Sequence, residues 1–175
     1  MKDVSGLLRR LGPIGRIART IKQRLTRKRT VVTYRLVMET FRPVPLPKTW
    51  HVTTTRDPNH VGLHSARETC HILLLDDGVG GKGYSSIPAD GKWAIGETGT
   101  TLDMPVGSLL LTAFRTAPEM QGRGIYTALL SSILRTFFDN GGKEAYIGAV
   151  EGNHASHAAI KKLGFIRYEV HGPSR

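Results

Sequence analysis

The segment from Thr116 to Tyr126, TAPEMQGRGIY, joins a glycine-rich turn to the start of an apolar stretch with helical spacing. A strand-like run precedes it, so the turn lies between a strand and a helix. The free backbone N–H groups and the positive dipole end of such a helix attract phosphate. Gly122 and Gly124 let a pyrophosphate approach the backbone and tolerate a positive φ. The spacing therefore predicts a phosphate-binding turn.

Other nucleotide and metal motifs fit the chain poorly. It contains no GxxxxGK[ST] sequence for a P-loop, and the turn lacks the three-glycine spacing of a dinucleotide-binding fold. The single cysteine, Cys70, allows neither a disulfide within the chain nor a thiolate zinc cluster. Because Cys70 lies in an apolar run, we interpret it as a core residue, and we predict no metal site.

A second element supports a more specific interpretation. Asn153 and Ser156 open a helical stretch that ends in KLGF, residues 162–165. With the phosphate turn before it, the chain resembles the GNAT acyltransferases, whose turn reads [RQ]-x-x-G-x-[GA] and whose later element reads N-x-x-[AS] before K-x-G-F. Gln121 and Gly124 match the turn. The resemblance covers roughly the last 70 residues well and the first hundred loosely.

The resemblance implies an α/β (α+β) fold with a mixed central sheet, splayed at the cofactor site and with helices on both faces. It also implies acetyl-CoA, or another acyl-CoA, as the donor, with its thioester between the two splayed strands. The residues that it assigns to the coenzyme are Phe114, Thr116, Gln121, Gly122, Arg123, Gly124, Ile125, Tyr126 and Asn153.

Two residues depart from the family pattern. Tyr126 replaces the small residue that usually closes the turn, and it either shifts the backbone or points its ring outward. Ile160 stands where many members place a tyrosine that protonates the leaving thiolate. The resemblance therefore implies that water or another group serves as the acid here.

The resemblance further implies direct attack on the thioester by a neutral amine or hydroxyl, which needs a base within reach. Glu97 is the first candidate, and Asp103 is a weaker substitute; the alternative for Glu97 is a solvated turn carboxylate. Ser156 is the second candidate catalytic residue, flanked by His154 and His157, either of which has a pKa suited to proton transfer. A helix cap is the alternative for Ser156.

The surrounding sequence predicts the elements that hold these residues. Apolar and β-branched runs indicate strands, and apolar stripes at spacings of three and four indicate helices. A proline-rich connector is expected over 41–50. The expected strands span 30–38, 51–55, 70–75, 84–87, 93–97, 107–114, 146–150 and 165–171, and the expected helices span 61–68, 125–139 and 156–163.

The first 30 residues differ from the rest. They hold ten basic residues and one acidic residue, out of 25 and 14 in the whole chain. We expect a basic amphipathic helical extension over 1–30 and an acyltransferase domain over 31–175. The extension either adsorbs to an anionic membrane surface or packs on the domain. A presequence or an RNA-binding arm ranks behind both, so nucleic acid is not an expected partner.

The sequence therefore predicts a cytoplasmic N-acetyltransferase, peripheral at the inner face of the membrane if residues 1–30 adsorb there. The expected reaction transfers acetyl from acetyl-CoA to a primary amine of a small acceptor, with an amino sugar of surface polysaccharide synthesis as the most specific guess. The alternative is a catalytically degenerate acyl-CoA-binding regulatory module, which Ile160 and the lack of a certain base suggest. A homodimer is left open.

Overall fold

The computed structural model describes residues 29–55, 68–76 and 78–173. The expected extension over 1–30 lies outside the described residues except for its last two positions. The helix expected over 61–68 lies outside them except for Glu68.

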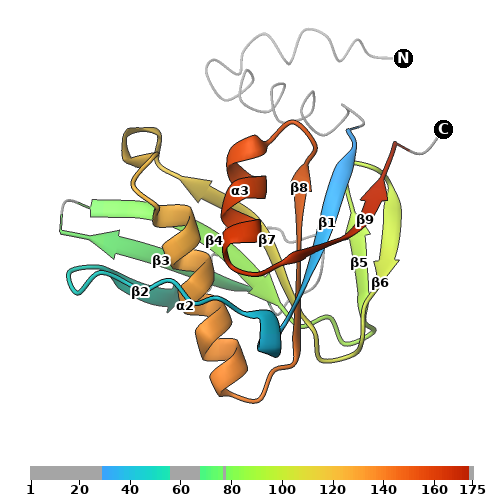
Figure 1. Ribbon diagram of the computed structural model, residues 1–175, viewed down its shortest axis with the longest axis horizontal. Coiled ribbons are helices and arrows are strands. Elements are labelled where there is room, and N and C mark those ends of the chain that lie inside the picture. Colours follow the sequence, from blue (N-terminus) through green and yellow to red (C-terminus); the bar gives the residue numbers. More distant parts are fainter. Residues whose placement is uncertain (1–28, 56–67, 77, 174–175) are drawn as a thin grey trace, which may run out of the picture.

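A seven-stranded sheet in the order β2-β3-β4-β7-β8-β1-β9 forms the centre of the molecule (Figure 1). Neighbouring strands pair antiparallel, except β7 and β8, which are parallel. The sheet is therefore mixed, as predicted. Its strands are β1 (Val31–Val37), β2 (His51–Thr55), β3 (Thr69–Leu75), β4 (Gly78–Ser86), β7 (Leu109–Thr116), β8 (Glu144–Val150) and β9 (Ile166–His171).

Two helices and a hairpin cover this sheet. Among the described residues, the α-helices are α2 (Ile125–Asp139) and α3 (His154–Lys162), and the hairpin consists of β5 (Lys92–Ile95) and β6 (Thr100–Asp103). Short 3-10 turns are η2 (Met38–Thr40) and η3 (Pro118–Met120). Among the described residues, no helix combines the length and apolarity needed to cross a bilayer.

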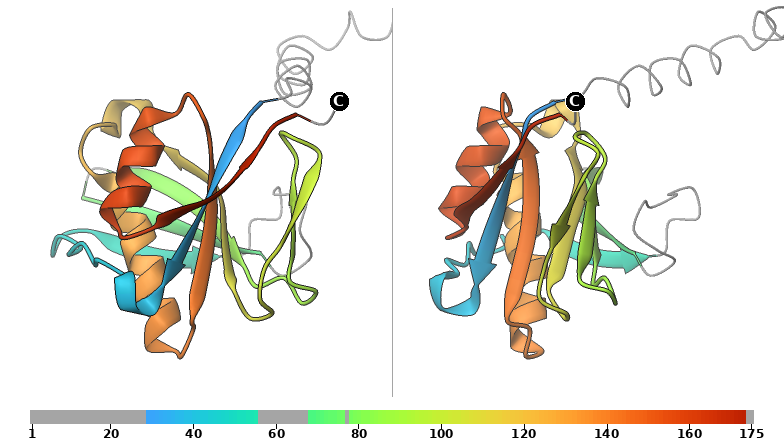
Figure 2. Two further views of the ribbon diagram at one scale, coloured as in Figure 1. Left: turned by 45° about the vertical axis from the view of Figure 1, so that its right-hand side comes forward. Right: turned by 90° about the vertical axis from the view of Figure 1, so that its right-hand side faces the viewer.

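The helices and the hairpin lie on opposite faces of the sheet (Figure 2). Successive side chains of β7 point to opposite faces of the sheet and so contact both layers. Leu109 and Leu111 pack with α2 and α3, whereas Leu110 packs with the hairpin. We expected helices on both faces. In the part of the chain that the structure describes, the hairpin takes the place of helices on one of them, because its apolar residues bury that face.

The helix α2 crosses from β7 to β8 and forms the centre of the larger core. Ile125, Leu129 and Ile133 recur at spacings of four and are buried against the sheet. Burial of each such side chain stabilises the fold by about 1.5–3 kcal/mol. The helix ends at Asp139, before Gly141 with φ +82. The predicted helix is thus confirmed at both ends.

The strand β4 is longer than predicted. We expected a strand over 84–87 after a glycine-rich turn, but β4 begins at Gly78. Its glycines serve close packing: a Cβ on Gly80 would lie 2.7 Å from Leu75, and a Cβ on Gly81 would lie 2.9 Å from the Arg115 carbonyl oxygen. A run of glycines can therefore belong to a buried strand. The strand β6 was not predicted.

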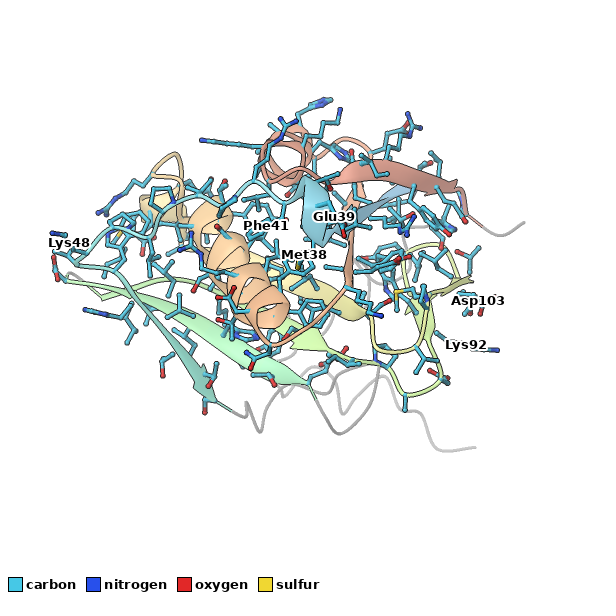
Figure 3. All side chains as sticks on the ribbon, turned by 60° about the horizontal axis from the view of Figure 1, so that its bottom comes forward. Met38, Glu39, Phe41, Lys48, Lys92 and Asp103 are labelled. Atoms are coloured by element: carbon cyan, nitrogen blue, oxygen red, sulfur yellow. The ribbon has the colours of Figure 1, made fainter. Side chains whose placement is uncertain are left out.

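The proline-rich connector runs along α2 from Phe41 towards Lys48 (Figure 3). The Phe41 and Phe138 ring centroids are 5.3 Å apart, and Ser131 Oγ donates to the carbonyl of Val44 at 2.9 Å. No helix or strand forms between Phe41 and Trp50, which are described throughout, and this confirms the predicted connector.

The KLGF ending has a packing reason for its glycine. Gly164 has φ +94, and a Cβ there would lie 1.9 Å from the Thr40 carbonyl oxygen. The Arg42 N–H donates to the Leu163 carbonyl at 2.9 Å. The end of α3 and the turn after β1 are therefore in backbone contact, which only glycine allows.

Candidate functional site

The strands β7 and β8 diverge inside the sheet (Figure 1). Within these two fully described strands, pairing runs from Leu109 opposite Ala145 to Leu111 opposite Ile147 and goes no further. Beyond Leu111, the backbone groups of β7 that face β8 lack a strand partner. Such an edge can bind an extended ligand by main-chain hydrogen bonds.

A bulge in β7 accompanies this divergence. Ala113 has φ +52, and among the described residues it is the one non-glycine residue with a positive φ. The register between β4 and β7 shifts at the same point, between Lys82 and Tyr84. The Phe114 ring lies over Gly83, where a Cβ would be 2.2 Å from it. The bulge therefore turns Phe114 onto β4 and opens the side of β7 that faces β8.

A cavity of about 400 Å³ occupies the gap between the two strands. Its walls come from both faces of the sheet. Tyr126, Asn153 and Ser156 line it from the helix side, and residues 93–97 of the hairpin line it from the other side. Glu68, which precedes β3, also lines it. The cavity is thus accessible to groups from either face.

The predicted phosphate turn lies at the start of α2, beside the helix-side wall. Gly122 has φ +77 and Gly124 has φ +78, and a Cβ at either position would meet no atom within 4 Å. Backbone conformation, not crowding, therefore requires glycine in this structure. The first bond within the helix runs from the Ala128 N–H to the Gly124 carbonyl at 3.0 Å, so the N–H groups of 125–127 have no helical partner. The turn has the geometry of an anion site.

The other predicted residues of the turn take different positions. Gln121 and Arg123 are exposed, and Arg123 Nη1 lies 2.7 Å from Met120 Sδ. Ile125 is buried in the core, so that only its backbone N–H could contact a ligand. Thr116 ends β7 and pairs with Gly81.

Asn153 caps α3 and Ser156 lies in its first turn, because the helix begins at His154, two residues before the predicted start. The Asn153 Oδ1 accepts a hydrogen bond from the Ser156 N–H at 3.2 Å and caps the helix. The Asn153 oxygen is therefore engaged, and a ligand would contact its amide nitrogen. The cap belongs to Asn153, so the alternative interpretation of Ser156 as the cap does not hold.

Tyr126 points towards α3, which neither of our alternatives foresaw. Its ring packs edge to face on Phe114, with centroids 5.7 Å apart and planes at 72°. Burial raises the pKa of Tyr126 to about 12, and the Ser156 side chain opposes part of this rise. The phenol is therefore neutral near pH 7. Ile160 is fully buried in the core.

His157 has a structural role. Its Nδ1 is 2.8 Å from Tyr34 Oη, and its Nε2 is 3.0 Å from the Glu151 carbonyl oxygen and 3.1 Å from that of Val150. A tautomer with the proton on Nε2 satisfies all three contacts. Because both ring nitrogens are engaged, His157 does not serve as the base. His154 is exposed.

Two carboxylates line the cavity. Glu97 is exposed in the turn after β5, and its carbonyl accepts from the Arg29 N–H at 3.2 Å. Glu68 has one carboxylate oxygen buried. The sequence analysis missed Glu68 because only the pairing of β3 with β4 brings it to the cavity. Asp103 pairs with Lys92 at the far end of the hairpin and does not line the cavity (Figure 3).

Comparison with solved structures supports the fold. A GCN5-related N-acetyltransferase from Kribbella flavida matches with a TM-score of 0.54 and 10% identity, over 91% of this chain and 64% of its own. A tandem GNAT protein from the clavulanic acid biosynthesis pathway matches with a TM-score of 0.57 and 14% identity, over 84% of this chain and 55% of its own. AAC(6')-Iy, in complex with the bisubstrate analogue CoA-S-monomethyl-acetylneamine, matches with a TM-score of 0.52 and 17% identity, over 69% of this chain and 92% of its own.

Across five of the matched structures, this chain spans between 54% and 66% of the length of the matched protein. No functionally curated protein matches it in sequence. The model of the Acetyltransferase (GNAT) family matches residues 34–165, which include the splayed strands, the phosphate turn and both helices. This confirms the resemblance and the predicted fold: the chain belongs to the GNAT acetyltransferase family.

Proposed function

We propose that this protein transfers an acetyl group from acetyl-CoA to a primary amine of a small acceptor. One observation carries the proposal: the cavity between β7 and β8 lies beside a glycine turn with free backbone N–H groups, and two carboxylates line it. A donor with a pyrophosphate fits the turn, and a cationic acceptor fits the two carboxylates. Membership of the GNAT family agrees with this assignment.

On the donor side, the N–H groups of 125–127 would bind the pyrophosphate of the donor substrate. The unpaired edge of β7 beyond Leu111 would bind the amide-bearing pantetheine arm as an added strand binds a sheet edge. The Asn153 amide nitrogen would donate to the same arm. Phe114 contributes a wall, since its ring is held by Tyr126 and by the close approach at Gly83.

On the acceptor side, Glu68 and Glu97 would attract an ammonium group to the hairpin mouth. A carboxylate, directly or through water, then takes the proton that the nitrogen must lose before it can attack. The new C–N bond forms as the C–S bond breaks, and the thiolate takes a proton from water or a nearby hydroxyl. Glu68 is our first choice of base because it lines the cavity and one of its carboxylate oxygens is buried there.

The acceptor class is a finer proposal. AAC(6')-Iy was solved with an analogue that joins coenzyme A to an acetylneamine. An amino sugar is therefore the first acceptor to test, and one from surface polysaccharide synthesis would agree with a membrane-adsorbed basic extension over 1–30.

The test is acetyl transfer from labelled acetyl-CoA to a panel of amino sugars, small amines and peptide N-termini. Glu68→Gln should lower kcat/KM by roughly 100-fold if Glu68 is the base, with donor affinity unchanged. Glu97→Gln should mainly raise the KM for the acceptor. Asp103→Gln is the control, because Asp103 does not line the cavity. Donor binding without transfer to any acceptor would contradict the proposal.

That last result would favour the second candidate, an acyl-CoA-binding regulatory module without catalysis. Buried Ile160 supports it, because this residue offers the site no proton donor. Failure to bind any acyl-CoA would exclude both candidates.

A further inference from the structure

A positively charged side chain lines the same cavity as the two carboxylates. Arg115 of β7 is exposed, and it lines the cavity together with Glu68 and Glu97. In the part of the chain that the structure describes, no carboxylate forms an ion pair with its guanidinium. The proposed function uses the two carboxylates and gives this cation no role.

The strand register places Arg115 on the face of the sheet that the hairpin covers. Arg115 is the cross-strand partner of Lys82, so the two side chains lie on one face. Lys82 Nζ is 5.9 Å from the centroid of the Tyr84 ring, and Tyr84 pairs with Thr112. Thr112 follows Leu110 by two residues, and Leu110 packs with the hairpin. Arg115 therefore belongs to the hairpin face.

The side chain before Arg115 points to the other face. Phe114 packs against the core on the helix side and against the Tyr126 ring. Because successive side chains of a strand alternate, Arg115 is directed away from that core. The phosphate turn lies at the start of α2, which covers the helix face (Figure 2). Arg115 thus points away from the proposed pyrophosphate site and towards the proposed acceptor.

Glu68 lies on the hairpin face as well, but further along the strands. It directly precedes β3, and the register of β3 with β4 places it near Ser86, on the same face as Lys82. Ser86 and Lys82 are four residues apart on β4, which puts the Glu68 and Arg115 backbones on the order of 15 Å apart across three strands. Both side chains are long and line one cavity, so their charged ends can contact opposite ends of one small molecule.

We propose that Arg115 binds an anionic group of the acceptor, so that the acceptor of this site is an amine with a phosphate or a carboxylate several bonds from its nitrogen. Glu68 and Glu97 bind the ammonium end. Arg115 binds the anionic end, and the positive charge of Lys82 beside it adds to the attraction. An amino sugar phosphate and a short peptide with a free C-terminus both have this arrangement. The inference rests on the proposed function, because it assumes an amine acceptor at the hairpin mouth.

The experiment measures acetyl transfer by the full chain to two matched pairs of acceptors. Glucosamine 6-phosphate is compared with glucosamine, and alanylalanine is compared with its C-terminal amide. The two members of a pair carry the same amine and differ in the anionic group. The kcat/KM should be roughly tenfold higher for the anionic member of one pair, because one charge-assisted contact is gained. The pair that shows this difference identifies the anion as phosphate or carboxylate.

Arg115→Gln should abolish this preference. It should raise the KM for the anionic acceptor roughly tenfold with kcat unchanged, because the contact is remote from the reacting atoms and is equally strong in the ground state and the transition state. The affinity for acetyl-CoA, measured by calorimetry, should stay the same. Arg115→Lys should keep part of the preference, because it keeps the charge but not the planar fork.

Lys92→Gln is the matched control. It also removes one positive charge, from the far end of the hairpin, and Lys92 does not line the cavity. The preference for the anionic acceptor should therefore persist in this variant. Melting temperatures of all variants show whether the fold is kept.

Equal kcat/KM for both members of both pairs would overturn the inference and leave the proposed function standing. A preference that persists in Arg115→Gln would do the same. So would an equal loss in Lys92→Gln, which would assign the effect to overall charge, or weaker acetyl-CoA binding in Arg115→Gln, which would assign Arg115 to the donor. If acetyl-CoA binds and no acceptor is acetylated, the proposed function fails and the inference fails with it.

Discussion

Gly124→Leu should separate donor binding from folding. Gly124 has φ +78 at the start of α2, and Gly141 has φ +82 just after its end. A Cβ at either site would meet no atom within 4 Å, so both substitutions are strained by backbone conformation alone. Each should lower the free energy of unfolding by about 1–2 kcal/mol. The two variants are thus matched in stability and differ only in which end of α2 they alter.

Their effects on donor affinity should differ widely. The N–H groups of 125–127 follow Gly124, and a leucine side chain there would both cover the approach to them and rotate the peptide. Hydrogen bonds to a charged group are worth about 1.5–3 kcal/mol each. Loss of two such bonds to pyrophosphate would weaken acetyl-CoA binding by roughly 100-fold or more. Gly141→Leu should change the affinity by less than about twofold.

The assay is calorimetric titration with acetyl-CoA at a temperature where both variants are folded, together with urea unfolding to verify the stability match. Binding by Gly124→Leu within threefold of Gly141→Leu would refute our placement of the pyrophosphate. A large affinity loss in both variants would also refute it, because it would trace the effect to the stability of α2.

Three further changes test the fold around the site. Gly164→Ala should lower the free energy of unfolding by at least about 2 kcal/mol in urea, because its Cβ would overlap the Thr40 carbonyl oxygen and the residue has φ +94. His71 has a lowered pKa from burial, so its contribution to stability is present above pH 6.5 and is lost as the pH falls; His71→Gln should reduce the loss of stability on acidification. Arg35 lowers the pKa of Glu144 through hydrogen bonds, so Glu144→Gln should cost about 1 kcal/mol at pH 7, and this difference should shrink below pH 4.5.

The donor half of the site could be predicted from sequence because its signals are local. The turn and the start of α2 each consist of a few consecutive residues, and the structure gives them the expected geometry. The helix cap at Asn153 was not expected, because the cap alternative was placed on Ser156. A positive φ at Gly122 and Gly124 could be inferred from the spacing of the glycines alone.

The direction of the Tyr126 side chain could not be predicted in the same way. Ser156, whose side chain acts on its hydroxyl, lies on another helix, and the Phe114 ring that it packs on is set by the bulge at Ala113. Because the positive φ of this bulge lies at an alanine and not at a glycine, no local sequence pattern indicates the bulge. Glu68 was missed for a related reason, since only strand pairing brings it to the cavity.

The two mouths of the cavity differ in how they are built, and this explains why the donor is easier to identify than the acceptor. In the proposed function, backbone N–H groups bind the donor, so one short segment with fixed φ angles carries the signal. The acceptor of that proposal would meet side chains from the hairpin and from the start of β3. The hairpin position depends on Trp93 packing over Gly148, where a Cβ would be 2.7 Å from the indole. Hairpin residues such as Glu97 could therefore vary and change the acceptor while the donor turn remained intact.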